Sequence, residues 1–408
     1  MRDKMLFLLI VLVSVLLIFS LLYLAGVFSE NGIHTNRDTS VDAALSVIET
    51  SDGGYALAGF TQTVGTEDGD FWLIKTDEDG NEEWNQTYGG EKFETAHSLV
   101  ETSDGGYALA GDTQSFGAGD SDYWLVKTDE NGNEEWNQTY DKGADERARS
   151  LLETSDGGYV LAGDISYSSV DLDYGWYEAW LVKTDENGNM EWSRTYGGKG
   201  FDGAYGLVEA SDGGYVLAGF TQVWGDGWND FWLVKTDPNG NLDWRQNYGG
   251  DRPQEAYALV EASDGGYALA GFTDLSDTER SAFWFVKTDK DGDMVWNQTI
   301  RGDYDYDYDY AWDLVEVPDG GYALVGRTDY VDPEGYDVVL IKTDKNGNVE
   351  WNQTYRREMS EEANSLVVTS DGGFIIAGYT GSSGYEYPDF WLAKTDANGN
   401  MQWNRTYG

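Results

Sequence analysis

Apolar and polar positions alternate along residues 44–408 in a pattern that repeats with a basic period of 52 residues. In the second repeat, short runs of apolar, aromatic and β-branched residues are separated by turns rich in Gly, Asp and Asn. These runs predict four β-strands, at residues 98–101, 107–111, 122–128 and 135–140. No segment between the repeats has helical periodicity. We therefore expect each repeat to be a small sheet of four antiparallel strands.

Three markers recur in every repeat and allow the repeats to be counted. A Ser-Asp-Gly-Gly tetrad, with Pro in place of Ser once, begins at Ser51, Ser103, Ser155, Ser211, Ser263, Pro318 and Ser370. A Lys-Thr-Asp triad begins at Lys75, Lys127, Lys183, Lys235, Lys287, Lys342 and Lys394. A tryptophan follows each triad at a constant offset, at Trp84, Trp136, Trp192, Trp244, Trp296, Trp351 and Trp403.

Seven such repeats predict an all-β protein, a seven-bladed β-propeller of four-stranded antiparallel blades. We expect the ring to close by packing between the first and last blades, without strand exchange; an open β-solenoid is the alternative. Residues found in every repeat are expected to build the blade rather than to carry chemistry. The seven tryptophans would pack between blades, and the triads would form hydrogen bonds within the third strand and its turn.

The N-terminal segment predicts a membrane anchor. Residues 5–28 form a stretch of 24 residues without a charged side chain, which as a helix of ~36 Å would cross a ~30 Å hydrocarbon core. Arg2 and Lys4 precede this stretch, so the positive-inside rule places the N-terminus in the cytoplasm. We expect residues 1–28 to be a cytoplasmic tip and one transmembrane signal anchor, and 29–43 to be a polar linker. Residues 44–408 would then be a propeller on the extracellular side of the cell membrane. A cleaved signal peptide is the alternative.

Charge and composition narrow the classes of partner. The formal net charge is −48, which disfavours binding to nucleic-acid backbones, and we predict no nucleic-acid partner. This charge is explained either by a solvated acidic surface or by sites for cations. The chain has no cysteine, which excludes disulfides, thiolate metal sites and a cysteine nucleophile.

The repeat also resembles known families. The second repeat contains the run Thr87-Tyr88-Gly89-Gly90, then Glu94, Ala96, Ser98-Leu99, Asp104-Gly105-Gly106-Tyr107 and Gly111. This run resembles the SBBP-type β-propeller repeats of bacterial and archaeal surface proteins. The spacing of Asp129, Gly132 and Trp136 is similar to the tryptophan-docking repeat of PQQ quinoprotein dehydrogenases. The first resemblance implies a surface propeller. The second implies a quinone cofactor, although the vicinal cysteine pair of many of those enzymes is missing here.

One periodic set of acidic residues predicts a cation site. Two residues before the alanine that opens each first strand stand Asp42, Glu94, Glu146, Asp202, Gln254, Asp309 and Glu361. The first strand of a propeller blade lines the channel, so these six carboxylates would form a ring at its mouth. A ring of like charges is costly without compensation. It would therefore either accept backbone hydrogen bonds locally or share a cation such as Ca²⁺.

Departures from the repeat predict a binding face. The third repeat is longer by four residues between tetrad and triad, and the connection from the fifth to the sixth repeat is longer by three. Both insertions leave from the same face of an up-and-down blade, where loops commonly carry function. Aromatic rings there would stack on a ligand while carboxylates accept hydrogen bonds. The predicted ligand-binding residues in these loops are Tyr174, Trp176, Tyr177, Trp224, Trp228, Tyr306, Tyr308 and Trp312.

We therefore expect a membrane-anchored binding or scaffold module for a glycan or a cell-surface protein, rather than an enzyme. The alternatives are an enzyme at the channel mouth, either a carbohydrate hydrolase or a quinoprotein-like dehydrogenase, and a structural component of the cell envelope. The only histidines are His34 and His97, so a Ser-His-Asp system would depend on His97. Glycosylation is expected at some of the sequons that begin at Asn85, Asn137, Asn297, Asn352 and Asn404.

Overall fold

A computed structural model describes residues 40–167, 175–198, 200–223, 227–275, 280–301, 308–330, 335–356, 361–381 and 388–408. The chain divides into two compact units, Met1–Asp38 and Thr39–Gly408, and all described residues belong to the second. Across these described ranges, no helix is long and apolar enough to cross a membrane. The predicted anchor at residues 5–28 lies outside them.

The described residues form 28 β-strands. The first sixteen are β1 (Ser40–Glu49), β2 (Tyr55–Thr63), β3 (Gly69–Thr76), β4 (Glu82–Tyr88), β5 (Glu94–Glu101), β6 (Tyr107–Thr113), β7 (Asp122–Thr128), β8 (Glu134–Tyr140), β9 (Asp145–Glu153), β10 (Tyr159–Tyr167), β11 (Trp176–Thr184), β12 (Met190–Tyr196), β13 (Gly200–Glu209), β14 (Tyr215–Val223), β15 (Asp230–Thr236) and β16 (Leu242–Tyr248). The others are β17 (Gln254–Glu261), β18 (Tyr267–Asp274), β19 (Ser281–Thr288), β20 (Met294–Ile300), β21 (Asp309–Glu316), β22 (Tyr322–Tyr330), β23 (Gly335–Thr343), β24 (Val349–Tyr355), β25 (Glu361–Val368), β26 (Phe374–Thr380), β27 (Asp389–Thr395) and β28 (Met401–Tyr407).

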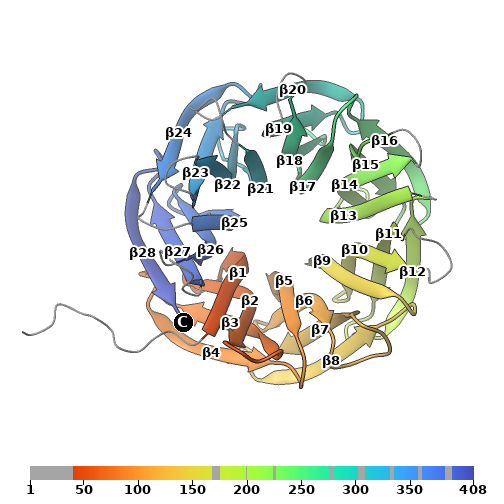
Figure 1. Cartoon of the computed structure of the whole chain (residues 1–408), viewed down its shortest axis with the longest axis vertical. Helices are drawn as coiled ribbons and strands as arrows, with labels where there is room; N and C mark the ends of the chain where they lie inside the picture. The colour runs from red at the N-terminus through yellow and green to blue at the C-terminus, as the bar shows by residue number, and fades with distance from the viewer. Residues whose placement is uncertain are drawn as a thin grey trace, which may run out of the picture. The chain divides into compact units, whose positions relative to one another are not determined.

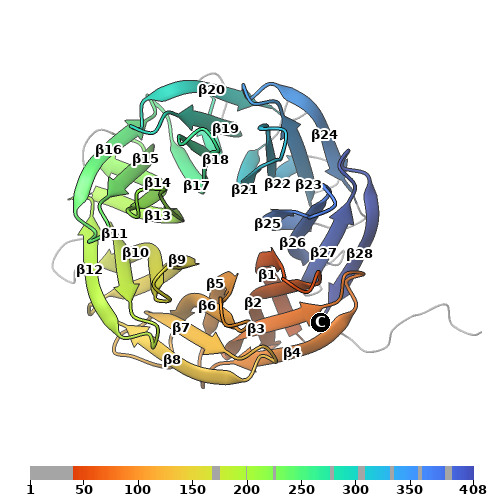
Figure 2. The same cartoon turned by 180° about the vertical axis from the view of Figure 1, so that it is seen from behind.

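Consecutive strands pair in antiparallel sets of four, which lie around a common centre (Figure 1). Five sets are separate four-stranded sheets, whereas β9–β12 and β13–β16 join into one eight-stranded sheet through a parallel pair at Tyr177 and Phe201. In both views the first strand of each set is nearest the centre and the fourth is outermost (Figures 1 and 2). We refer to each set of four strands as a unit and number the units in chain order.

Neighbouring units pack through a repeated tryptophan and, except after Ile300, a repeated tyrosine hydrogen bond. The Trp84 ring packs 5.8 Å from the Tyr107 ring of the next unit, and the Tyr88 hydroxyl donates to Gly132 O at 2.6 Å. Gly132 has a φ of 76°, which suits the turn, and an added Cβ would lie 2.5 Å from the Trp84 ring. The repeated tryptophans therefore pack between units, as predicted.

The last unit meets the first through this same arrangement. The Tyr407 hydroxyl donates to Gly80 O at 2.7 Å, and the Trp403 and Tyr55 rings lie 6.0 Å apart. Strands β1–β4 and β25–β28 form separate sheets, so no strand is exchanged at this junction. The ring closes by side-chain packing, in agreement with the prediction and against an open solenoid.

The Lys-Thr-Asp triad joins two turns of its own unit. Lys127 is only 4% exposed, and its Nζ donates to Thr128 O at 2.8 Å. The same ammonium forms ion pairs with Asp104 at 2.9 Å and Glu135 at 3.0 Å. Each lysine thus joins the third strand to the turn between the first two strands. Four of them, Lys75, Lys127, Lys183 and Lys342, also pair with a glutamate of the fourth strand, a wider set of contacts than the sequence predicted.

The first strands differ from the expected pattern in length and in shape. β1 begins at Ser40, within the predicted linker, because Asp42 pairs with Thr61 of β2. Each first strand also carries a register shift one residue after its alanine, as at His97, which lies unpaired between Ala96 and Ser98. This β-bulge changes which side the following residues face.

A glycine in each second strand makes room for the bulge. An added Cβ at Gly111 would lie 1.8 Å from Thr95 O, which no side chain tolerates. The same approach, at 1.9–2.0 Å, occurs at Gly59, Gly163, Gly219, Gly271, Gly326 and Gly378. The repeated glycine is therefore a condition for the bulged first strand.

Candidate functional site

The bulge places one non-repeated residue of each unit at the centre of the ring. We call this set the axial layer; its members are Leu45, His97, Arg149, Tyr205, Tyr257, Trp312 and Asn364. All seven are partly exposed, so solvent reaches them. The residue after the glycine of each second strand varies equally, and these are Phe60, Asp112, Asp164, Phe220, Phe272, Arg327 and Tyr379. The side chains that differ between units therefore lie next to the bulge and the glycine, which all units share.

Three aromatic members of the axial layer form a continuous arc across units four to six. The Tyr205 and Tyr257 rings lie 5.1 Å apart, and the Tyr257 and Trp312 rings lie 4.5 Å apart. Arg149 of the third unit lies over the Tyr205 ring at 5.6 Å and extends the arc. Such distances are typical of aromatic pairs and of cation–π contacts.

Each end of the arc carries an arginine paired with a carboxylate. Arg149 Nε donates to Asp164 at 3.1 Å, and the Arg327 guanidinium donates to Glu362 at 3.0 Å. Arg327 also lies 5.7 Å from the Trp312 ring. Both arginines keep about a fifth of their side chains exposed, at 23% and 22%. The arc therefore offers ring faces in the middle, with charged donors and acceptors at both ends.

His97 occupies the axial position of the second unit but does not form a catalytic triad. His97 Nε2 lies 2.9 Å from Asp112, and the Ser121 hydroxyl donates to the other oxygen of the same carboxylate at 3.1 Å. Burial lowers the pKa of His97, against the hydrogen bond with Asp112, which raises it. The histidine and the serine thus meet the aspartate rather than each other, and the serine–histidine hydrogen bond of a catalytic triad is not formed between them.

The structure places the predicted aromatic ligand-binding residues in several different surroundings. Trp312 belongs to the arc, whereas Trp176 stacks on Tyr167 at 4.9 Å and Tyr177 lies 5.5 Å from Phe201. Trp228 is 53% exposed and Tyr308 is 39% exposed. The remaining three, Tyr174, Trp224 and Tyr306, lie outside the described residues.

The loops that carry these residues leave from the face where the first strands begin. Ser166 at the end of β10 pairs with Asp145 at the start of β9, and Ser281 of β19 bridges Tyr308 just before β21. Both lengthened connections therefore start at this face, which we call the rim, as the sequence predicted. Residues 168–174 and 302–307 of these connections are not among those described.

The six predicted metal-binding carboxylates are all buried at the rim. Their exposed fractions range from 0% to 3%, for Asp42, Glu94, Glu146, Asp202, Asp309 and Glu361. Glu94 accepts hydrogen bonds from Gly90 N at 3.0 Å, Thr113 Oγ1 at 2.9 Å and Ser115 N at 3.1 Å. Asp202 accepts from Gly198 N at 2.9 Å and from Thr221 Oγ1. Local donors therefore hold these two carboxylates within their own units.

The sequon asparagines have structural partners in the fold. Asn85 Oδ1 accepts from the Trp72 indole at 3.2 Å, while Asn85 Nδ2 donates to Glu82 at 2.6 Å. Asn137 repeats both contacts with Trp124 and Glu134. Attachment of a glycan to Nδ2 would compete with the second of these bonds, and glycosylation stays a prediction.

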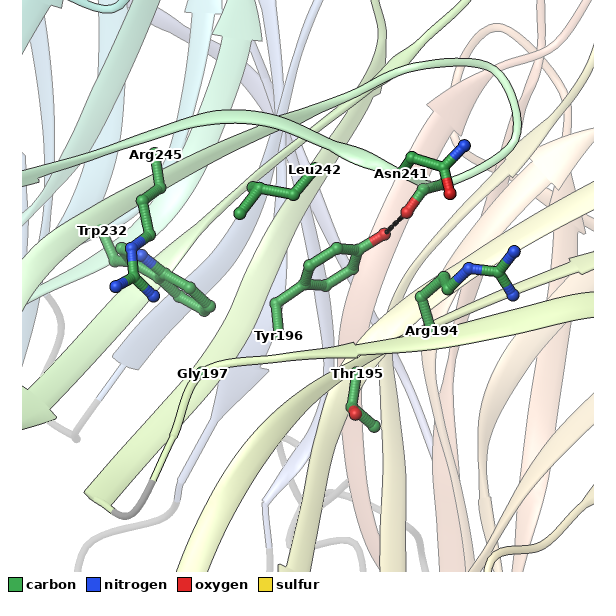
Figure 3. A pocket seen from close by; sticks show the side chains of 9 residues that line it. Arg194, Thr195, Tyr196, Gly197, Trp232, Asn241, Leu242 and Arg245 are labelled. Carbon is green, nitrogen blue, oxygen red and sulfur yellow. Dashed lines mark hydrogen bonds between the residues drawn. The ribbon is translucent and has the colours of Figure 1, made fainter.

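A separate cavity lies at the outer edge between units three and four (Figure 3). It has a volume of about 300 Å³, and Arg194 and Arg245 lie on either side of Tyr196. The Tyr196 hydroxyl donates to Gly240 O at 2.7 Å, a contact that recurs at the other junctions except the one after Ile300. A second cavity of about 170 Å³ shares Trp232 and Arg245 with the first. Much of this site is repeated framework, unlike the axial layer.

Sequence reasoning missed most of the arc, namely Arg149, Tyr205, Tyr257 and Arg327. The available signal was the residue after the alanine of each first strand, which differs in almost every repeat although the alanine before it is constant. Reading that signal required knowledge of the bulge, which turns this residue toward the centre.

No protein-family model and no curated protein matches the sequence. Among solved structures, the WD40 domain of Pan2 from Neurospora crassa is similar with a TM-score of 0.51 and 10% identity, covering 82% of this chain and 85% of that one. YCF48 bound to a D1 peptide is similar with a TM-score of 0.50 and 10% identity, covering 88% and 92%. An apocarotenoid oxygenase variant from Synechocystis gives 0.50 and 10%, covering 90% and 93%. These likenesses concern fold alone: the unit Thr39–Gly408 is an all-β protein with a propeller-type fold.

Proposed function

We propose that this chain is a binding module, a seven-bladed propeller whose arc of axial residues holds a glycan. The single observation that carries the proposal is the continuous row Arg149, Tyr205, Tyr257 and Trp312, built from positions that differ between units. The membrane anchor at residues 5–28 and the kinship with SBBP-type surface repeats are parts of the same proposal. They would present the rim to the outside of the cell.

The chemistry of the arc fits a sugar. Tyrosine and tryptophan rings offer flat apolar surface to the C–H face of a pyranose, while hydroxyl groups need donors and acceptors at its edge. Arg149 with Asp164, and Arg327 with Glu362, supply both kinds of partner at the two ends of the arc. Because these side chains already pair with one another, they are held in place before a ligand binds, which lowers the entropic cost of binding.

A partner protein of the cell surface is the second candidate. It is favoured by the likeness in fold to YCF48, whose structure contains a bound D1 peptide. Tyrosine, tryptophan and arginine are also the residue types that dominate binding energy at protein interfaces. The enzyme alternatives gain less support, since His97 is bonded to Asp112 and away from Ser121.

A glycan array probed with the purified full-length chain tests the proposal. We expect binding to a defined group of glycans, and the Trp312→Ala and Tyr257→Ala variants should weaken it by roughly tenfold or more. Phe116→Ala is the matched control, because Phe116 is an aromatic residue of the second unit that is 40% exposed and lies outside the arc. It should bind like the unmodified chain.

The possible outcomes distinguish the identity of the ligand from the location of its binding site. If no glycan binds but envelope proteins do, and Trp312→Ala abolishes that binding, the ligand is a protein and the site stands. If the arc variants bind as well as Phe116→Ala does, the arc is not the site and the proposal fails.

A further inference from the structure

One rim junction, between units two and three, differs from the others in its charge. At the junction between units one and two, the first residue after the fourth strand lies between two side chains, one from the start of the third strand and one from the rim of the next unit. At Gly89, an added Cβ would lie 1.8 Å from Asp70 Oδ1 and 2.8 Å from Glu94 Oε2. A side chain at Gly89 would therefore be directed at a pair of carboxylates, and we call the equivalent place in every unit the junction position.

The residue at the junction position is not the same in every unit. In chain order the seven residues are Gly89, Asp141, Gly197, Gly249, Arg301, Arg356 and Gly408. Arg356 Nε donates to Asp337 at 2.9 Å, so here the protein supplies its own cation to the junction. Asp141 does the opposite, because it adds a third carboxylate to Asp122 and Glu146.

The geometry of these three carboxylates is that of a cation site. Asp122, Asp141 and Glu146 each offer one oxygen, and these oxygens lie within 4.8 Å of one another. Asp122 is 1% exposed and Glu146 is 0% exposed, whereas Asp141 is exposed and leaves a path to solvent.

Two of the buried oxygens have no hydrogen-bond donor. Within the described part of the chain, Asp122 Oδ1 and Glu146 Oε2 lack any partner. The other oxygen of Glu146 accepts from Ala144 N at 3.0 Å and Lys142 N at 3.2 Å, so the loop fixes the carboxylate and leaves Oε2 for another ligand. A buried carboxylate oxygen without a donor is costly unless a proton or a cation meets it.

Burial disfavours the charged forms of Asp122 and Glu146, the two buried carboxylates of this set. Burial raises the pKa of Asp122 to about 6, and the nearby Asp141 adds to this shift. Burial also raises the pKa of Glu146 to about 7, against the two backbone hydrogen bonds, which lower it. Lys142, the nearest basic residue in the loop, has its ammonium over the Trp180 ring at 5.4 Å.

We propose that Asp122, Asp141 and Glu146 bind one Ca²⁺ ion and thereby join the second unit to the third. The ligand set contains only oxygen, which favours a hard cation such as Ca²⁺ over Zn²⁺. Asp122 begins β7, Asp141 follows β8 and Glu146 lies in β9, so the ion would bridge two sheets. This site is a single junction rather than a ring of six carboxylates, and it does not depend on the proposed function.

Calcium titration of the full-length chain tests the site. The chain is first freed of metal with EDTA, and Ca²⁺ is added while binding heat and thermal unfolding are followed. We expect one saturable ion per chain and a rise in the unfolding temperature. Asp141→Gly restores the residue that four other units carry, so it should fold, and it should weaken binding by roughly tenfold or more.

Two further variants separate the site from the general acidity of the chain. Asp251→Gly removes an exposed carboxylate from the loop after Gly249 and Gly250, and it should bind Ca²⁺ as the unmodified chain does. Asp141→Arg imitates Arg356, so it should be as stable in EDTA as the unmodified chain is in Ca²⁺ and should not respond to Ca²⁺. The proposal is overturned if the unmodified chain binds no saturable ion at millimolar Ca²⁺, or if Asp141→Gly and Asp251→Gly respond equally.

Discussion

The outer framework of the units and the axial layer use the same repeat in opposite ways. In the framework, Trp84 packs on the next unit in the same manner as Trp403 does at the closing junction. In the axial layer, equivalent backbone positions carry residues as unlike as His97 and Trp312. The framework keeps its side chains constant because each must fit the same neighbour, whereas an axial side chain meets a different neighbour in every unit.

This difference gives a rule for locating function in a repetitive fold. Side chains that every unit shares account for packing between units, and side chains that vary in regular strands need another explanation. The bulge allows such variation without loss of sheet stability, because its residue forms no ladder pair with the second strand. Variation at a bulge therefore changes the surface at the centre without disturbing the sheet.

The largest expected effect is on the framework at the closing junction. Trp403→Ala should destabilise the protein by about 3 kcal/mol through the loss of a large packed ring. Trp244→Ala is the matched variant inside the ring, since Trp244 lies 6.2 Å from Tyr267 as Trp403 lies 6.0 Å from Tyr55. Urea unfolding of both variants should give similar losses. A much smaller loss for Trp403→Ala would mean that the ring is weakly closed and that the framework is not uniform.

A smaller effect is expected at Asp313, directly after the axial Trp312. Asp313 accepts hydrogen bonds from Leu366 N of the next unit and from Leu314 N, both at 2.7 Å. At two other junctions a serine hydroxyl accepts the bond from the next unit, as Ser46 does from Leu99 N and Ser98 does from Leu151 N. Burial raises the pKa of Asp313 to about 6, against these hydrogen bonds, which lower it. The charged form is thus costly in the folded state, and stability is lost as pH rises from about 4 through 6.

Asp313→Ser should remove that cost and keep the bond to Leu366. At pH 8 the variant should be more stable than the unmodified chain by about 1–3 kcal/mol, and the difference should vanish below about pH 4. Denaturation at a series of pH values measures this. Ser365→Ala, which removes a hydroxyl donor to Asp313 without touching its charge, is the control and should not abolish the pH dependence. A gain that is the same at every pH would show that folding does not raise the pKa of Asp313.

The sequence was sufficient for the framework because its signals are local. Alternating apolar runs, Asn-Gly turns and the constant triad-to-tryptophan offset each follow from contacts within one unit or with the next. The start of β1 was missed because Ser40 and Asp42 are polar, yet their place beside Thr61 and Thr63 makes them strand residues. Pairing with a partner strand decided the boundary, and no pattern in residues 29–43 records it.

The axial layer and the Asp141 site were harder to predict for a geometric reason. A strand alternates its side chains between two faces, and a bulge of one residue reverses that alternation for everything after it. Whether Tyr205 faces the next unit or the centre therefore depends on a feature with no fixed residue type. Asp141 likewise gains meaning only from its position between Asp122 and Glu146, which come from a different strand and a different unit.

The smallest expected effect has the opposite dependence on pH and lies in the framework. Asp104 accepts from Thr102 Oγ1 at 2.6 Å and pairs with the buried Lys127. Although partial burial raises it, these contacts and the bond from Gly106 lower the pKa of Asp104 to about 2. The contribution of Asp104 to stability is therefore present above its ordinary pKa of 3.8 and is lost as pH falls toward 2.

Asp104→Asn should therefore cost up to about 1 kcal/mol at pH 7, a small loss because the carboxylate is largely exposed to solvent. The loss should shrink as pH falls below 4, where Asp313→Ser also ceases to differ from the unmodified chain. The two variants then converge in acid and diverge in opposite directions near neutral pH, one less stable and one more stable. If both diverge in the same direction, burial at Asp313 is not what sets its charge. The framework and the inner strand would then no longer differ in how well they tolerate an ionised aspartate.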